Sequence, residues 1–187
     1  MTRYADDWLV TCKSRSEAVS ALAAARRILE RLGVTLHSEK TRIVHVRQGF
    51  EFLGYKIKRG SQKLNLAPGK IRSGAVQGDL YAYPREKSIK HFTEQIRKRT
   101  RRKAPVGTKE LIEEINPVIR GWGNYYCKAH VRKLFNRFDR WIVQRIWSHR
   151  RKRWRNAGWK ELPEAILYGE MGLVNLISLI PSIAPAR

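Results

Sequence analysis

The pattern of apolar residues changes from short runs to long helical repeats near residues 84–88. Before that point most apolar segments are short and are separated by Gly, Pro and polar residues, although one helical repeat lies between Ser14 and Leu32. After it, apolar residues recur every three or four positions over long stretches. Alternation indicates strands and a period of 3.6 indicates helices. The chain is therefore expected to be α+β, with short antiparallel strands and one helix followed by an all-α part of three helices.

The first 86 residues are expected to form the mixed part. Tyr4–Cys12 is rich in large residues and contains adjacent acids, which predicts two strands joined by a tight turn at Asp6 and Asp7. Ser14 or Ser16 can cap the first helix, and Gly33 can end it. The other expected elements are short strands at Val34–Leu36 and Thr41–Val46, a strand at Phe50–Lys58 with a bulge or close backbone approach at Gly54, and a hairpin with a connection over residues 59–86.

The rest of the chain is expected to be helical. Thr108 is a predicted N-cap because acidic residues follow it. Gly121–Tyr126 predicts a turn or a helix junction. Residues 161–187 form an apolar tail with several helix breakers, and two alternatives are open for it: packing onto the helices, or poor order. The predicted helices are Ser88–Arg102, Thr108–Ile119 and Ala129–Trp154, and the predicted units are residues 1–86, 87–160 and 161–187.

The charge balance limits the partners of this chain. It has 39 Lys and Arg against 16 Asp and Glu, a formal net charge of +23. Such a chain attracts polyanions, and nucleic acid is the usual one. Its most apolar stretch, Met171–Ile183, is shorter than the roughly 20 residues that a bilayer span requires. We therefore expect a cytoplasmic protein that has no membrane partner.

Cysteine and histidine spacing argues against two other classes of site. Cys12 and Cys127 lie far apart, and the five His residues show no metal-ligand spacing. A disulfide framework and a zinc site are therefore not expected.

The third predicted helix has an apolar stripe and a basic face. Residues 97–155 contain 19 Lys and Arg but only four acids, so they carry most of the excess charge. A basic face is usually a solvated surface, but here no row of acids balances the cations, which favours contact with phosphates. The stripe consists of Leu134, Phe138, Trp141, Ile142 and Ile146, and the polar face of Lys133, Arg137, Arg140, Gln144, Ser148 and Arg151. The candidate RNA-binding residues are Arg120, Lys128, Lys133, Arg137, Arg140 and Arg151.

Aromatic residues in this half of the chain have two readings. Trp141 and Trp147 are expected to be core or half-buried residues rather than platforms for bases. Trp122, Tyr125 and Tyr126 are expected to pack the helices together, with exposed edges available to RNA as the alternative.

The adjacent acids near the start point to a different chemistry. Paired carboxylates can bind Mg²⁺, which prefers hard oxygen ligands, and two such ions can activate a phosphoryl-transfer reaction. A bare pair of aspartates is weak evidence, since most pairs lie on solvated turns. The surrounding residues Tyr4-Ala5-Asp6-Asp7 form the YxDD pattern of reverse transcriptases.

Three landmarks in a fixed order make this resemblance specific. They are YADDWLV (Tyr4–Val10), FEFLGY (Phe50–Tyr55) and INPVIRGWGNYY (Ile115–Tyr126) followed by a basic helix. Together they resemble the group II intron reverse transcriptases, whose members copy RNA into DNA and help their own intron fold and splice. The resemblance implies that residues 1–86 are the end of a polymerase palm and that residues 87–160 are a three-helix thumb, the maturase domain X.

The resemblance also implies individual roles. Asp6 and Asp7 would be catalytic metal-binding acids, and Phe52, Leu53, Gly54 and Tyr55 would form a primer grip. The implied partners are group II intron RNA, an RNA/DNA duplex and the remaining half of the polymerase. The implied location is a bacterial cell or an organelle matrix.

The chain departs from the family pattern in one respect. The third palm aspartate and the fingers, which precede YxDD in the family, have no counterpart here, so Mg²⁺ is expected only if that half is supplied. Asp79 and Asp139, the other aspartates, have no matching context. Three hypotheses about the function of the chain remain open. They are a maturase fragment that binds intron RNA and is inactive as a polymerase, a polymerase subunit that needs a separately encoded half, and a general basic nucleic-acid-binding protein.

Overall fold

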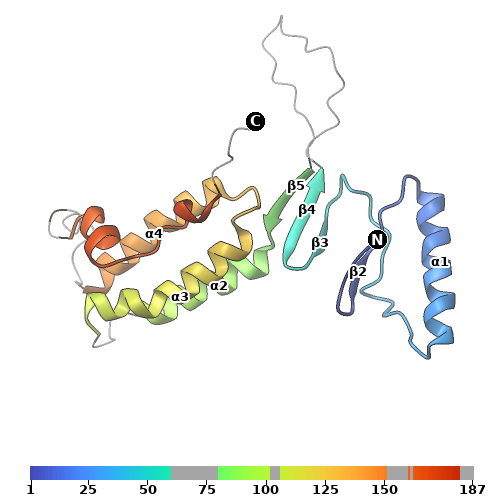
Figure 1. Cartoon of the computed structure of the whole chain (residues 1–187), viewed down its shortest axis with the longest axis horizontal. Coiled ribbons are helices and arrows are strands. Elements are labelled where there is room, and N and C mark those ends of the chain that lie inside the picture. Colours follow the sequence, from blue (N-terminus) through green and yellow to red (C-terminus); the bar gives the residue numbers. More distant parts are fainter. Residues whose placement is uncertain (60–79, 102–105, 151–159, 161, 182–187) are drawn as a thin grey trace, which may run out of the picture. The chain divides into compact units, whose positions relative to one another are not determined.

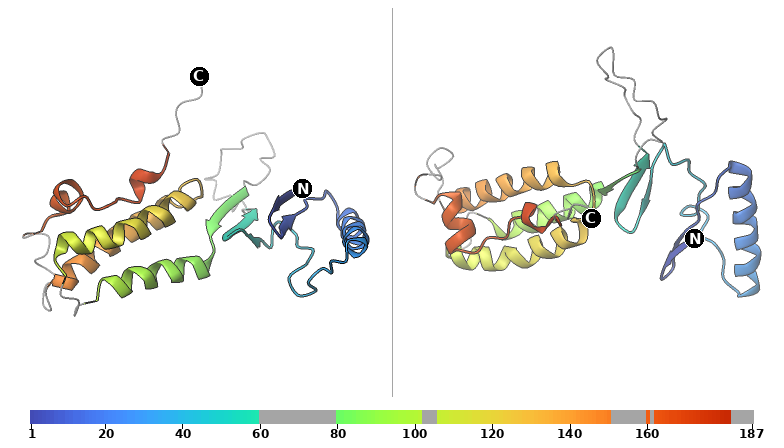
Figure 2. Two further views of the ribbon diagram at one scale, coloured as in Figure 1. Left: turned by 60° about the horizontal axis from the view of Figure 1, so that its bottom comes forward. Right: turned by 45° about the horizontal axis from the view of Figure 1, so that its top comes forward.

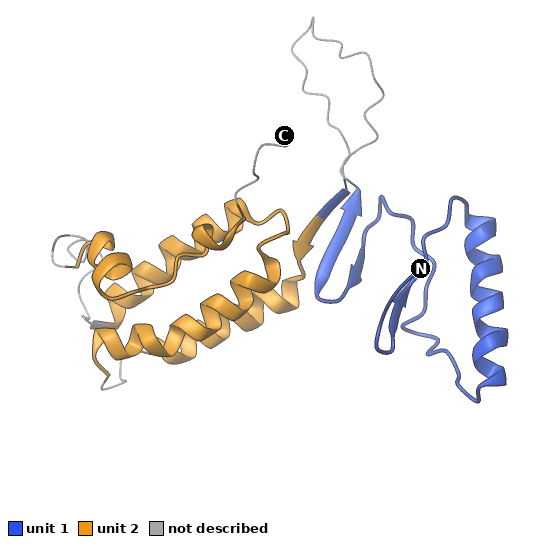
Figure 3. Cartoon of the chain, in the orientation of Figure 1, with its two compact units in different colours: residues 1–81 blue, residues 82–187 orange. Residues whose placement is uncertain are grey.

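The computed structural model describes residues 1–59, 80–101, 106–150, 160 and 162–181 (Figure 1). The chain divides into two compact units, Met1–Tyr81 and Ala82–Arg187 (Figure 3). Short antiparallel strands and one helix precede three long helices, which confirms the predicted α+β class. The predicted limits of the functional domains stay predictions.

A two-stranded hairpin opens the first unit. Strands β1 (Thr2–Tyr4) and β2 (Asp7–Leu9) pair antiparallel, with Tyr4 opposite Asp7. The predicted hairpin exists, but it begins at Thr2 rather than Tyr4, and its turn consists of Ala5 and Asp6 while Asp7 belongs to β2. Ala5 has a φ of 51°, which is uncommon for a residue other than glycine. The turn therefore places one acid in the loop and the next on the following strand.

Helix α1 (Arg15–Arg31) follows, and its N-terminus is capped as predicted. The Ser14 hydroxyl oxygen accepts a hydrogen bond from the Glu17 backbone N–H at 3.2 Å. None of its residues is buried.

The prediction of two short strands after α1 is wrong. Val34–Leu36 and Thr41–Val46 have no strand assignment. The Val34 N–H bonds to the Leu29 carbonyl at the end of α1, and the Thr41 N–H bonds to the His37 carbonyl within a turn. A strand requires a ladder of backbone hydrogen bonds to a neighbouring strand. In the described part of the chain, these two segments make a single such contact, the bond from the Arg59 N–H to the Val46 carbonyl at 3.0 Å.

The single strand predicted at Phe50–Lys58 is a hairpin instead. Strands β3 (Phe50–Phe52) and β4 (Tyr55–Arg59) pair antiparallel with Phe52 opposite Tyr55. Leu53 and Gly54 have φ values of 47° and 78°, as a two-residue type I′ turn requires. Gly54 is therefore a turn residue and not a bulge. Strand β5 (Leu80–Pro84) completes a sheet of order β3-β4-β5, and the predicted hairpin at residues 59–86 lies largely outside the described residues.

Three helices form the second unit: α2 (Glu86–Arg99), α3 (Thr108–Tyr126) and α4 (Arg132–Arg150), which lie side by side (Figure 1, Figure 2). Their facing apolar residues form the core of this unit. The fully buried side chains include Phe92, Ile96, Leu111, Ile112, Ile115, Ile119, Val131, Phe135, Ile142 and Ile146.

The helix boundaries differ from the predicted ones at several points. Helix α3 continues through Gly121–Tyr126, where a turn or junction was predicted, and it contains Pro117. Its buried face extends to Tyr126, so tertiary packing outweighs the unfavourable propensity of Pro and Gly. Its N-cap is Gly107 rather than Thr108, and the Glu110 carboxylate accepts from the Gly107 N–H at 3.2 Å.

Helices α2 and α4 also begin at other residues than predicted. Helix α2 begins two residues early, at Glu86. Helix α4 begins at Arg132 rather than Ala129, because the His130 N–H bonds to the Ala82 carbonyl at 2.9 Å and holds the preceding residues in a loop.

Residues 162–181, named here the C-terminal strap, pack onto α3 and α4 (Figure 2). The strap contains a π-helical turn, η1 (Ile166–Glu170), and a short 3₁₀ helix, η2 (Ile177–Leu179). Its buried side chains are Leu167, Leu173 and Leu176. Of the two alternatives for the tail, the described part shows packing.

Two polar side chains anchor the strap. Asn116 of α3 donates to the Gly172 carbonyl and accepts from the Val174 N–H, each at 2.9 Å. The carboxylate of Asp139 in α4 accepts from the Leu176 N–H at 2.8 Å and from the Ile177 N–H at 3.2 Å. Burial raises the pKa of Asp139, and these two hydrogen bonds oppose the shift only partly.

Candidate nucleic-acid interface

The outer face of α4 presents a row of exposed cations. Lys133, Arg137 and Arg140 are exposed, as is Gln144 further along the helix. Among the described residues no carboxylate lies within ion-pair distance of these three cations. Steps of three and four residues place them on one side of the helix. Their positive charge is therefore open to an external anion.

The opposite side of α4 largely follows the predicted stripe. Phe138, Ile142 and Ile146 are buried, while Leu134 and Trp141 are half-buried. The core side is wider than the stripe, because Val131, Phe135 and Val143 are also buried. The cation row thus lies on a helix whose inner face is fixed by packing, and this limits its movement.

The other candidate cations have mixed outcomes. Arg120 of α3 and Lys128 of the loop between α3 and α4 are exposed. Arg151 lies outside the described residues. Ser148, placed on the polar face by spacing, is half-buried and donates to the Arg145 carbonyl at 3.1 Å.

Two arginines near this face have structural roles instead. Arg145 donates to the Thr100 hydroxyl and to the Thr100 carbonyl, each at 3.0 Å, and so caps the C-terminus of α2 with a positive charge. Arg99 donates to the side-chain oxygen of Gln95 at 2.7 Å and lies 3.6 Å from the Glu114 carboxylate. Charge counting alone does not separate these arginines from the ones that face solvent.

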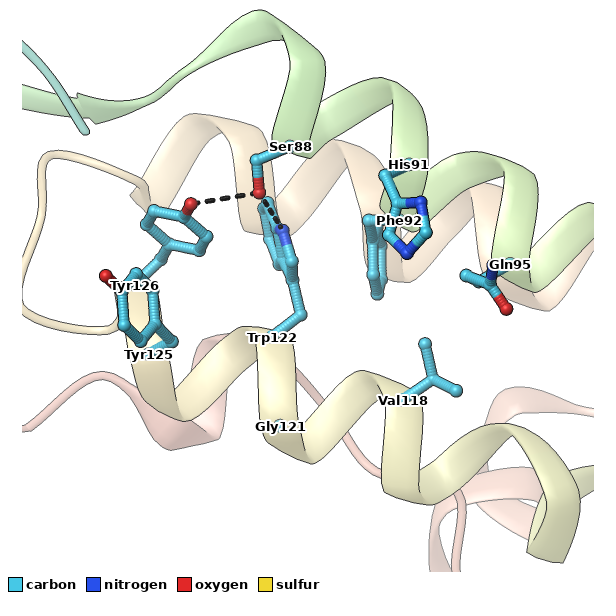
Figure 4. Close-up of a pocket in the computed structure, with 9 residues that line it drawn as sticks. All are labelled: Ser88, His91, Phe92, Gln95, Val118, Gly121, Trp122, Tyr125 and Tyr126. Atoms are coloured by element: carbon cyan, nitrogen blue, oxygen red, sulfur yellow. Dashed lines mark hydrogen bonds between the residues drawn. The ribbon is translucent and has the colours of Figure 1, made fainter. Parts of the chain in front are cut away.

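The three aromatic residues near the end of α3 do not share one role (Figure 4). Trp122 stacks on Phe92 of α2 with ring centroids 4.5 Å apart. Its indole N–H and the Tyr126 hydroxyl both donate to the Ser88 hydroxyl oxygen, at 3.1 and 2.9 Å. Tyr125 is 52% exposed. The expected packing role is confirmed for Trp122 and Tyr126, while Tyr125 presents its ring to solvent.

A shallow pocket of about 460 Å³ opens between α2 and α3 beside these rings. It is lined by Ser88, His91, Phe92, Gln95, Val118, Gly121, Trp122, Tyr125 and Tyr126 (Figure 4).

The candidate residues of the first unit lie on two separate hairpins. Asp6 and Asp7 are exposed at the β1–β2 turn. Phe52, Leu53, Gly54 and Tyr55 are half-buried and surround the β3–β4 turn. Among the described residues, no group of three or more His, Cys, Asp or Glu side chains could hold a metal ion.

No helix in the described part of the chain is long and apolar enough to cross a membrane.

Comparison with known proteins assigns both parts of the chain. Residues 89–163 match the family described as "Group II intron, maturase-specific domain". Residues 1–57 match the family described as "Reverse transcriptase (RNA-dependent DNA polymerase)". Each part of the chain is thus similar to one part of the group II intron reverse transcriptases/maturases.

Curated relatives from one bacterium match across both parts. Two sequences of the group II intron-encoded protein LtrA, from Lactococcus lactis subsp. cremoris and one of its strains, are each 28% identical to this chain over 142 residues. The match covers 68% of the chain but only 24% of each relative. Reverse transcriptases as a family use divalent metal ions. The resemblance first indicated by YADD, FEFLGY and INPVIRGWGNYY is thereby confirmed at the level of the family.

Proposed function

We propose that this chain binds group II intron RNA through the outer face of α4 and so assists splicing. The observation that carries the proposal is the row of Lys133, Arg137 and Arg140, which are exposed, have no carboxylate partner among the described residues and lie on a packed helix. The row falls within the segment that matches the maturase-specific domain. Arg120 and Lys128 extend the proposed contact area, and Arg151 is a further candidate.

Contacts to phosphates increase the affinity for RNA, but they do not by themselves select one RNA over another. Each Lys or Arg that neutralises a phosphate releases a counterion, so affinity falls as salt rises. Contacts to the backbone carry no sequence information by themselves. We therefore attribute affinity to the cation row and leave recognition of intron shape to the larger surface around it.

DNA synthesis is the second candidate function, and the match of residues 1–57 to reverse transcriptases favours it. In this proposal Asp6 and Asp7 bind Mg²⁺, and Phe52–Tyr55 contact the primer. The two carboxylates do not make a complete metal site, because the described residues bring no third acidic ligand beside them. We therefore assign this chain no metal-dependent step of its own, and propose one only in the presence of a separately supplied polymerase half.

The proposed function can be tested with two triple variants of equal charge. The first combines Lys133→Gln, Arg137→Gln and Arg140→Gln. The control replaces the exposed Arg26, Arg27 and Arg31 of α1 by Gln. Affinity for a group II intron RNA and for an unrelated structured RNA of equal length is measured across a salt series.

The α4 variant should bind roughly ten- to a hundredfold more weakly at low salt, with a salt slope lower by about two to three. The control should retain most of the affinity. Equal losses in the two variants would show that total charge, rather than the α4 face, drives binding. Equal binding of both RNAs by the wild-type chain at every salt concentration would refute intron recognition and leave a general polycation.

A further inference from the structure

A series of contacts between aromatic rings and guanidinium groups crosses from α4 to α2 beside the cation row. The Arg97 guanidinium of α2 lies over the Trp141 ring of α4, with its carbon 5.8 Å from the ring centroid. The Arg137 guanidinium lies over the Phe138 ring at 5.7 Å. The rings of Phe138 and Trp141 are themselves neighbours, with centroids 6.1 Å apart. Two arginines from different helices are therefore held on one aromatic platform.

Each guanidinium lies over a ring, and no hydrogen bond from either one to another described residue is present. A guanidinium over an aromatic face is attracted by the ring and can still donate hydrogen bonds from its edge. Arg97 and Arg137 are exposed, and no carboxylate among the described residues pairs with either. Partial ordering before binding lowers the entropy lost when a ligand is bound. The guanidinium groups of Arg97 and Arg137 are therefore held over rings and exposed to solvent, and no carboxylate among the described residues neutralises their charge.

The neighbouring structure holds the platform in place. Arg145 donates to the carbonyls of Arg97 and Thr100, at 3.5 and 3.0 Å, and ties the last turn of α2 to α4. Phe138 contacts Phe92 of α2, with ring centroids 5.2 Å apart. The distance between Arg97 and Trp141 thus depends on a packed helix pair and not on a loop.

We infer that Arg97, held by Trp141, and Arg137, held by Phe138, form a two-arginine site for the phosphates of an RNA backbone. The inference rests on the proposed function and deepens it, because it extends the phosphate-binding surface from α4 onto α2. A guanidinium can bind the oxygens of one phosphate through two parallel hydrogen bonds. RNA is the occupant favoured by the adjoining row of Lys133, Arg137 and Arg140, whose charge continues the site along α4.

The sequence offers no signal for this pairing. Arg97 and Trp141 lie on different helices, and Trp141 was expected only as a core or half-buried residue. Only the packing of α2 against α4 brings them together.

The structure supplies a matched control within the same helix. Arg99 lies two residues from Arg97 and carries the same charge, but its guanidinium is engaged by Gln95 and Glu114. We would measure affinity for a short RNA duplex over a salt series for Arg97→Gln and Arg99→Gln. Arg97→Gln should lower affinity about tenfold at low salt and lower the salt slope by about one, whereas Arg99→Gln should change both much less.

Variants of the ring separate stacking from charge. Trp141→Leu leaves the charge unchanged and should weaken binding by about threefold, which the aromatic Trp141→Phe should largely restore. In an Arg97→Gln background, Trp141→Leu should have no further effect on binding, because the tryptophan acts through the arginine. Urea unfolding of every variant separates a loss of folding from a loss of contact.

Several outcomes would overturn the inference. Equal effects of Arg97→Gln and Arg99→Gln would do so, as would additive effects of Arg97→Gln and Trp141→Leu. A loss of binding to phosphatidylserine vesicles without a loss of RNA binding would indicate a lipid surface instead. If the α4 triple variant loses RNA while Arg97→Gln does not, the proposed function stands and the two-arginine site fails. If Arg97→Gln weakens binding but intron and unrelated RNA bind alike, the site stands without the intron-specific function.

Discussion

Replacing Asp139 tests how the C-terminal strap is attached to α4. Asp139→Ala removes the acceptor of two backbone N–H groups, but the two losses are not equal. The Ile177 N–H keeps the Asn175 side-chain oxygen as an acceptor at 2.8 Å, whereas the buried Leu176 N–H has no other acceptor among the described residues. One orphaned buried donor lowers the free energy of unfolding by about 1–3 kcal/mol. Asp139→Asn should lower it by about 1 kcal/mol or less, because the amide oxygen can still accept from Leu176.

The raised pKa of Asp139 also predicts how the stability difference between Asp139→Asn and the wild-type chain depends on pH. Burial holds the pKa of Asp139 above its ordinary value of 3.8, so the folded chain binds this proton more tightly than the unfolded chain. The stability contributed by Asp139 is therefore greatest in acid and falls as pH rises from 3.8 through the raised pKa. Asp139→Asn does not titrate. Its deficit relative to the wild-type chain should be largest in acid and should shrink toward neutral pH.

Equilibrium urea unfolding followed by tryptophan fluorescence provides the measurement. Five of the six tryptophans follow residue 121, so the signal reports mainly on the second unit. Glu113→Ala, at an exposed acid of α3, is the control and should change stability little. Wild-type stability in Asp139→Ala, or an Asp139→Asn deficit that grows toward neutral pH, would refute the reasoning.

Two further substitutions test the helix contacts. Ser88→Ala removes the acceptor of the Trp122 indole N–H, and it should lower the free energy of unfolding by about 1–3 kcal/mol. Urea unfolding measures this loss, and an unchanged unfolding midpoint would contradict the prediction. Arg145→Met keeps the apolar stem but uncaps the C-terminus of α2 at Thr100, and it should lower stability by about 1–2 kcal/mol. Hydrogen exchange should then be faster in the last turn of α2 than in α3, and uniform exchange would argue against the cap.

The sequence predicts the structure best where the local pattern of apolar residues agrees with the environment of those residues in the folded chain. The helix after Ser14 and the apolar stripe of α4 are both observed. In α4 the period of the apolar residues reports directly on which face is buried, whereas no residue of α1 is buried. The order of YADD, FEFLGY and INPVIRGWGNYY predicts the two families that the comparisons match, since three motifs in one order are far more restrictive than one.

Prediction fails where distant contacts decide the local structure. The glycines of Gly121–Tyr126 predict a turn or a helix junction, but α3 continues there. Gly123 is buried where η2 packs against it, and a Cβ there would lie 2.5 Å from the Leu179 side chain. Leu53 is a poor turn residue by propensity, and it nevertheless adopts a φ of 47° between two paired strands. The role of Asp139 depends on backbone groups 37 and 38 residues away. None of these contacts leaves a local signature.

The buried leucines of the C-terminal strap have a consequence for synthesis of the protein. The ribosome makes α2, α3 and α4 first, and Leu167, Leu173 and Leu176 only afterwards. Until those leucines emerge, the nascent helices expose the apolar surface that the strap later covers. During this interval the exposed surface favours association with other incompletely folded chains. Ribosome stalling just after α4 is therefore expected to yield an aggregation-prone intermediate, whose apolar surface is covered only when translation resumes.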